Sequence, residues 1–192
     1  MADDPLSAEL MDAMLSAGAA LWREYYRLHD LVVKIVAKSE LCGRLMAIPG
    51  IGQVSALSFM AAIGDPLRFR RSRDVAAYFG LTSRRWQSGT SINVQGRISN
   101  AGDADVRRAL YEAASALMAR FRGRDKVKSW GQQLAKRSCH RKACVAVARK
   151  LAVIMHAIWS DGTFYVGDVT ATDTEAAQRA QTKDRRLLGA HR

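Results

Sequence analysis

Cysteine is scarce in this chain, and three cysteines give no disulfide framework. The N-terminus lacks the basic stretch followed by an apolar one that marks a secretory signal, and no run approaches the roughly eighteen uncharged apolar residues of a membrane span. These absences argue against a secreted or membrane protein and favour a cytoplasmic one. Cys139, His140 and Cys144 lie close together, but a second pair of ligands is missing, so we expect this chain to bind no metal.

The usual catalytic patterns are missing too. The sequence has no carboxylate pair in an apolar setting, no Gly-rich Walker loop and no zinc-protease helix. His156 lies in an apolar helical pattern, where a hydrogen-bonded core histidine is the usual case. Ser88 follows arginines that would neutralise charge on an attacked phosphate. Since no nearby base or metal cluster would activate its hydroxyl, the residues alone favour a hydrogen bond to phosphate over nucleophilic attack.

Acidic residues are scarce in the middle of the chain. Residues 66–150 hold twenty Lys and Arg against five Asp and Glu, a balance of +15, whereas the whole chain carries +12. The excess is mostly arginine, whose planar guanidinium forks onto phosphate. This pattern predicts a polyanionic partner, and nucleic acid is favoured over an acidic membrane surface because no amphipathic anchor is present.

The turn Pro49-Gly50-Ile51-Gly52 separates two short apolar helical patterns. Proline ends the first helix, glycine permits a positive φ, and the N–H groups that open the second helix can approach a phosphate at the positive end of its dipole. The pattern predicts a helix-hairpin-helix, with an ordinary turn as the alternative. The candidate nucleic-acid contacts are this turn and the polar residues that follow it: Gly50, Gly52, Gln53, Arg84, Arg85, Arg97, Ser99, Arg107 and Arg108.

The apolar spacing predicts a mainly α protein in three parts: a linking, coiled-coil-like helix over 1–46, a domain over 47–165 and a polar, flexible tail over 166–192. The first part reads as one long helix over 7–47. Its seam follows the 4-3 spacing of a coiled coil at Leu21, Tyr25, Leu28, Val32 and Ile35. Packing on the protein's own core competes with dimerisation here, and we favour self-association.

Further elements follow from local patterns. We expect a short helix over 73–79 that Ser72 caps and Gly80 closes, and an irregular Ser/Gly/Arg-rich loop or a loose β-hairpin over 81–102. Asp103 should cap a strong helix with an apolar stripe, and a basic connection over 122–141 should lead to a last helix over 142–159. The stripe consists of Val106, Ala109, Leu110, Ala113, Ala114, Leu117, Met118 and Phe121.

Several motifs in order resemble one transposase family. They are Ile-Pro-Gly-Ile-Gly at 48–52, Arg-Phe at 68–69, Ala-Ala-Tyr-Phe-Gly-Leu-Thr at 76–82, Ser-Gly at 88–89, Gly-Arg-Ile-Ser-Asn-Ala-Gly at 96–102 and Leu-Tyr at 110–111. Together they resemble the C-terminal domain of the insertion-sequence 110/116/902 (one-ten) family, which is related to the Piv-type DNA invertases. The resemblance covers roughly residues 40–160, and the preceding helix resembles the coiled coil that joins this domain to a RuvC-like nuclease domain.

The resemblance implies a function. Members of this family are recombinases with a magnesium-binding site of four acids on the RuvC-like domain and a serine in the C-terminal domain. That serine attacks DNA to leave a 5′-phosphoserine, and a structured guide RNA chooses the sites. By motif position the serine falls on Ser88, not on Ser91 or Ser99. The resemblance thus implies DNA and possibly guide RNA as partners, and Mg²⁺ only on the RuvC-like domain.

The chain departs from the family pattern at its N-terminus. It begins at the linking helix and leaves no room for a RuvC-like domain, so we expect either a fragment of a longer transposase or a stand-alone truncated product. Two function classes stay open. One is a transposase domain that uses Ser88 for strand exchange when a nuclease domain complements it. The other is a non-catalytic DNA- or RNA-binding protein, an accessory or competitor of the full transposase.

Overall fold

A computed structural model describes residues 5–88 and 92–167, with the backbone alone over 85–88 and 92–95. The fold is mainly helical, as the sequence predicts, and the tail beyond residue 167 lies outside the described residues. The elements in chain order are α1 (Pro5–Ala37), α2 (Glu40–Met46), α3 (Gln53–Ile63), the 3-10 turn η1 (Pro66–Arg68), α4 (Ser72–Tyr78), β1 (Ser83–Ser88), β2 (Ile92–Ile98), α5 (Ala104–Ala119), α6 (Lys126–Arg137) and α7 (His140–Asp161).

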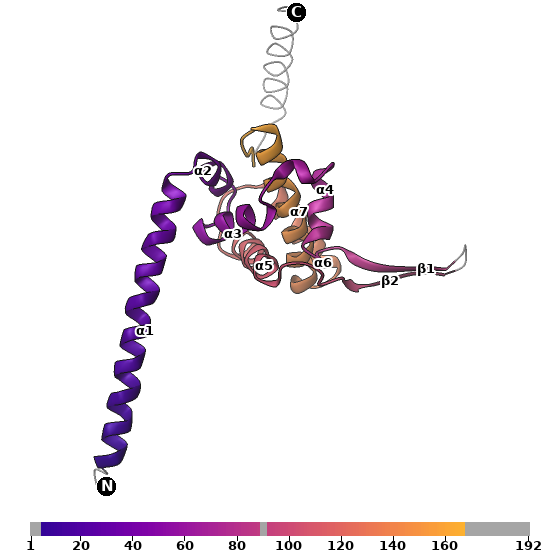
Figure 1. The fold of residues 1–192 in the computed structure, drawn as a ribbon. Helices are drawn as coiled ribbons and strands as arrows, with labels where there is room; N and C mark the ends of the chain where they lie inside the picture. The colour runs from indigo at the N-terminus through magenta and orange to yellow at the C-terminus, as the bar shows by residue number, and fades with distance from the viewer. Residues whose placement is uncertain (1–4, 89–91, 168–192) are drawn as a thin grey trace, which may run out of the picture.

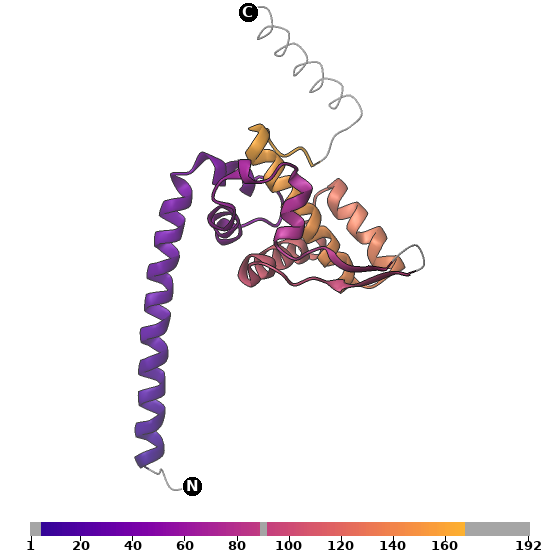
Figure 2. The ribbon, with the colours of Figure 1, turned by 45° about the vertical axis from the view of Figure 1, so that its right-hand side comes forward.

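The first helix stands away from the rest of the protein. Figures 1 and 2 show α1 as a rod on one side of a helical body, with the β1–β2 hairpin projecting on the other side. The single helix predicted over 7–47 is wrong, because the chain breaks between Ala37 and Glu40. Ser39 starts the new helix α2: its hydroxyl oxygen accepts a hydrogen bond from the N–H of Cys42 at 3.3 Å. This break lets α2 pack on α3 while α1 runs outward.

The core of the body is built around α7. The amphipathic helices α4, α5 and α6 all pack against it, and α3 packs on α5. By length and mean hydropathy α7 would also pass as a membrane-spanning helix, but half of its most apolar window is buried inside the protein, as in a core helix. Its largest fully buried side chains are Val147, Leu151, Met155 and His156.

The stripe predicted on α5 lies in this core as expected. Val106, Leu110, Ala113, Ala114, Leu117 and Met118 are buried, and Ala109 and Phe121 are half-buried. Asp103 caps the helix, since its carboxylate accepts hydrogen bonds from the N–H groups of Asp105 at 2.8 Å and Val106 at 3.1 Å. Both the period and the cap were readable from the sequence.

The connection predicted over 122–141 is wrong, because most of it forms α6. Asp125 is buried and caps this helix, accepting a hydrogen bond from the N–H of Lys128 at 2.9 Å. Val127 and Gly131 are the buried residues of α6. The abundance of Lys, Arg and Gln hid the narrow apolar face by which α6 packs against α7.

The start of α4 also differs from the prediction. Ser72 is the first residue of the helix rather than its cap, and the capping position belongs to Arg71, which makes no side-chain cap. The Ser72 hydroxyl instead lies 3.1 Å from Nδ1 of His156, whose Nε2 donates to the carbonyl oxygen of Pro66 at 3.0 Å. His156 is therefore a hydrogen-bonded core histidine, as predicted, and it ties α7 to η1 and α4.

Of the two alternatives for residues 81–102, the structure has the β-hairpin. β1 and β2 pair antiparallel, with Ser83 opposite Ile98 and Ser88 opposite Ile92. A bulge between Ser83 and Arg85 shifts the register. The short alternation of Trp86 with polar residues on β1, and of Ile92, Val94 and Ile98 on β2, was too weak to settle this choice from the sequence.

Candidate nucleic-acid interface

Ser88 occupies the end of β1 that is farthest along the hairpin from the body. The backbone pairs it with Ile92 across the hairpin. Its side chain, and that of Arg85, lie outside the described residues. Because a strand advances about 3.3 Å per residue, the six residues from Thr82 place Ser88 roughly 20 Å from the base of the hairpin. A residue on such a projection can reach a partner that the helical body does not touch.

The base of the hairpin brings two of the predicted contacts together. The guanidinium of exposed Arg84 donates to the carbonyl oxygen of Ser99 at 2.9 Å. Ser99 in turn accepts a 3.4 Å hydrogen bond from the N–H of Ala101 through its hydroxyl oxygen. Arg97 lies nearby in sequence on β2 and is exposed. Arg84, Ser99 and Arg97 thus gather at the base, several residues away from Ser88.

Arg107 and Arg108 begin α5 next to this base but differ in surroundings. Arg107 is half-buried, and its Nη1 donates to the carbonyl oxygens of Phe79 at 3.1 Å and Ala101 at 3.0 Å. Arg108 is exposed and forms a 3.4 Å ion pair with Asp105, which is also exposed. Arg108 therefore offers a solvated charge to a ligand, whereas the backbone of the protein already holds Arg107.

The turn between α2 and α3 lies apart from the hairpin and packs on α5. Gly50 has a φ of 92°, and a Cβ at this position would collide with the carbonyl oxygen of Ala113. Gly52 caps α3 and has open space around it, and half-buried Gln53 opens that helix. The close approach to α5 explains the glycine at position 50 by packing alone. The predicted phosphate contact at Gly52 and Gln53 stays a prediction.

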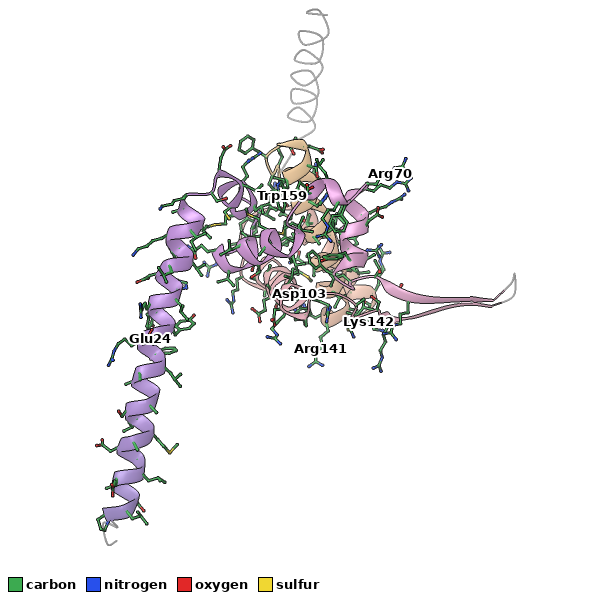
Figure 3. The ribbon with its side chains drawn as sticks, in the orientation of Figure 1. Glu24, Arg70, Asp103, Arg141, Lys142 and Trp159 are labelled. Carbon is green, nitrogen blue, oxygen red and sulfur yellow. The ribbon has the colours of Figure 1, made fainter. Side chains whose placement is uncertain are left out.

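The structure adds further exposed basic residues on the body that the sequence did not single out. Figure 3 shows Arg70, just before α4, and Arg141 and Lys142, at the start of α7, extending outward from the surface. All three are exposed. Arg68 lies 5.8 Å from the ring centre of Phe69 and 5.7 Å from that of Tyr78, so its charge rests on an aromatic surface. For Arg141 and Lys142 the helical phase would have indicated this exposure once α7 was placed.

Burial shifts the pKa values of Cys144 and Tyr165 in the body. Burial raises the pKa of the Cys144 thiol above its ordinary value. Burial and a 2.5 Å hydrogen bond to Asp125 raise the pKa of Tyr165 well above its ordinary value. Within residues 5–88 and 92–167 no group of three or more His, Cys, Asp and Glu is placed to hold a metal ion. The described residues thus do not fit the magnesium site of the family, and we derive no step through a metal on this chain.

The hairpin, the α2–α3 turn and the start of α5 fall within one matched segment. Residues 42–130 match the model of the transposase IS116/IS110/IS902 family. That segment belongs to that family. The matched residues include every candidate contact named from the sequence, as well as Ser88.

Curated relatives agree with this assignment. The chain is 39% identical over 128 residues to the transposase for insertion sequence element IS1111A of Coxiella burnetii, covering 66% of this chain and 35% of the relative. It is 30% identical over 171 residues to a putative transposase of Sinorhizobium fredii (86% and 44%). It is 33% identical over 115 residues to the pilin gene-inverting protein of Moraxella bovis (59% and 35%). The chain thus spans less than half the length of these relatives.

Proposed function

We propose that this chain is the DNA-binding C-terminal domain of a transposase or site-specific recombinase, and that Ser88 is its nucleophile for DNA strand exchange. The observation that carries the proposal is the family match over 42–130, which includes the projecting hairpin with Ser88 at its far end. The relatives' names point to transposition and to inversion of a pilin gene. The +15 balance of residues 66–150 supplies the attraction to a polyanion.

The proposed step is a transesterification. The Ser88 oxygen attacks a DNA phosphorus and forms a Ser–O–P bond. The bond between that phosphorus and the 3′ oxygen of the preceding nucleotide breaks, so the phosphate stays on the 5′ end of the DNA. The serine proton passes to a base, and the leaving 3′ oxygen takes up a proton. A serine hydroxyl is barely ionised at neutral pH, so the step needs activation that the described residues do not supply. We propose that a RuvC-like domain with bound Mg²⁺ supplies it, and that structured RNA guides site choice.

Self-association through α1 is part of the same proposal. The seam residues Leu21, Tyr25, Leu28 and Ile35 are all exposed, at 74%, 55%, 61% and 55%. Val32 near the C-terminal end is half-buried against the body. A stripe of this length in water favours association with another helix. We propose that a second copy covers it, which would bring two hairpins into one assembly in the cytoplasm.

A second candidate is a non-catalytic DNA- or RNA-binding protein that competes with or assists the full transposase. The observation in its favour is the same lack of a metal-binding group among the described residues. Both candidates predict strong salt dependence of binding, with a log–log slope near −5 if about six phosphates are engaged. They differ in whether Ser88 ever becomes linked to DNA.

The experiment that separates them uses the chain alone and the chain joined to a family RuvC-like domain with guide RNA. The isolated chain should bind DNA and cleave it negligibly with magnesium present. The joined protein should form a DNA-linked adduct that survives denaturation. Ser88→Ala should abolish the adduct while changing the binding free energy by less than about 1 kcal/mol, because one neutral hydrogen bond is lost. Ser99→Ala is the matched control, and loss of the adduct in that variant alone would refute the assignment of Ser88.

A further inference from the structure

The two ends of the hairpin meet in a narrow neck, formed by residues 79–82 on the entering side and 99–103 on the leaving side. The N–H of Ser99 donates to the carbonyl oxygen of Thr82 at 2.8 Å, and the N–H of Asn100 donates to that of Gly80 at 3.2 Å. Gly80 and Gly102 have φ values of 68° and 75°, and a Cβ on either would collide with the backbone of the opposite side. The two sides therefore touch through their backbones.

Arg107 fastens this neck to α5. Its Nη1 donates to the carbonyl oxygen of Phe79 on the entering side, at 3.1 Å. The same nitrogen lies 3.0 Å from the carbonyl oxygen of Ala101 and 3.4 Å from that of Asp103, both on the leaving side. Its two hydrogens are thus shared among acceptors from both ends of the hairpin, and the remaining guanidinium charge has no acidic partner among these contacts.

The neck controls where the hairpin points. Among the described elements, the strands pack extensively only on each other, so no helix supports the hairpin along its length. A tilt of 10° at the neck would move a residue roughly 20 Å away, where Ser88 lies, by roughly 3 Å. Misplacement of a reacting group by about 1 Å is enough to cost roughly a hundredfold in rate.

We propose that Arg107 is a positioning residue: it sets the direction of the hairpin, and with it the place of Ser88, by tying both sides of the neck to α5 rather than by contacting a phosphate. The consequence for Ser88 rests on the proposed function, whereas the role of Arg107 in the neck does not. Arg108 provides the matched comparison, because it is the next residue on the same helix, carries the same charge and is exposed.

The test compares Arg107→Ala, Arg107→Lys and Arg108→Ala in the full chain. Two quantities are measured: hydrogen exchange at the Ser99 and Asn100 amides, and the salt slope of DNA binding. Arg107→Ala should speed exchange at both amides by about tenfold or more and leave the slope unchanged. Arg108→Ala should leave exchange unchanged and reduce the slope by about 0.9, the loss of one phosphate contact. Arg107→Lys should keep the slope and give intermediate exchange, because one ammonium cannot span both sides of the neck as a guanidinium does.

A slope that falls by about 0.9 in Arg107→Ala, with unchanged exchange, would overturn the proposal and make Arg107 a phosphate contact. If Arg107→Ala does not fold, Arg107→Lys decides, since exchange equal to that of the unmodified protein would also overturn it. In the protein joined to its nuclease domain, adduct yield should fall in Arg107→Lys far more than DNA affinity does. If Arg107→Ala speeds exchange at the neck but no adduct forms even in the joined protein that keeps Arg107, the role of Ser88 is refuted and that of Arg107 is upheld.

Discussion

The two longest helices of this protein have opposite surroundings. α7 has 22 residues, and α4, α5 and α6 cover its apolar side chains, whereas α1 has 33 residues and leaves its large apolar side chains exposed along nearly its whole length. The sequence patterns of the two are similar, because both show helical apolar spacing. The difference shows that such spacing identifies a buried face without telling which molecule buries it. For α7 the cover is this chain, and for α1 we propose a second copy.

The largest expected difference between the two helices comes from truncating one leucine on each of them. Leu151 is fully buried on α7, and Leu151→Ala should lower the free energy of unfolding by about 3 kcal/mol, through lost burial and the cavity left behind. Leu28→Ala on α1 should change the unfolding of the helical body by less than about 0.5 kcal/mol. Denaturant unfolding followed by a signal from the body measures both. Equal losses would mean that α1 packs within its own chain.

Polar substitution of the seam tests whether a second copy of the chain covers the exposed face of α1. The double change Leu21→Asp and Leu28→Asp places charges in the exposed face that we propose to be shared, so sedimentation should shift to the mass of one chain while the body stays folded. Glu24→Gln on the same helix is a control that leaves the seam intact; Figure 3 shows Glu24 pointing away from the body. An unchanged mass in the double variant would contradict self-association through α1.

The segment after α7 gives a smaller, pH-dependent effect. Tyr165 donates to Asp125, the cap of α6, and its pKa is raised above the unfolded value of about 10. The contribution of Tyr165 is therefore fully present below about pH 10 and is lost as pH rises further, because only the unfolded chain then ionises this group readily. Tyr165→Phe should cost about 1 kcal/mol at neutral pH.

The difference in stability between the unmodified protein and Tyr165→Phe should shrink in alkali. Thermal unfolding at several pH values would measure it. A difference that grows with pH would contradict the assigned hydrogen bond. The segment after α7 thus behaves like the rest of the body, since contacts within the chain hold it, whereas most of α1 is exposed.

The smallest expected effect is on the salt slope of DNA binding, when charges are removed from the body or from the α1 side. Arg141 and Lys142 are exposed at the start of α7, and replacing both with Ala should reduce the salt slope of DNA binding by up to about 1.8. Lys34→Ala with Lys38→Ala removes the same charge from the α1 side and should leave the slope unchanged. Equal reductions would show that DNA binding does not distinguish the body from α1.

Much of the fold could be predicted because local signals were strong. The stripe and the Asp103 cap of α5 and the apolar run of α7 each combine a helical period with clear ends. The break at Ser39 and the helix α6 could not be predicted with the same ease. The former depends on α2 packing on α3, and the latter on a narrow apolar face that only matters once α7 is in place.

The candidate site was predictable in its residue types more than in its arrangement. The sequence singled out Arg107 for its charge, but the contact of its guanidinium with Phe79 spans 28 residues and needs the hairpin to be formed. Likewise the glycine at position 50 suggested a phosphate-binding turn, and the structure adds the close approach of α5 as a second reason for it. Ser88 itself came from motif position, since nothing around it in the sequence would activate a hydroxyl.

The most direct measurement of the central claim is the site of DNA attachment in the adduct formed with the nuclease domain and guide RNA. After nuclease and trypsin digestion, the added nucleotide mass should fall on the peptide of residues 86–97, which contains Ser88 and Ser91 but not Ser99. Fragmentation in the mass spectrometer should place that mass on Ser88. Attachment at Ser91, or on the following peptide that carries Ser99, would contradict the assignment of the nucleophile.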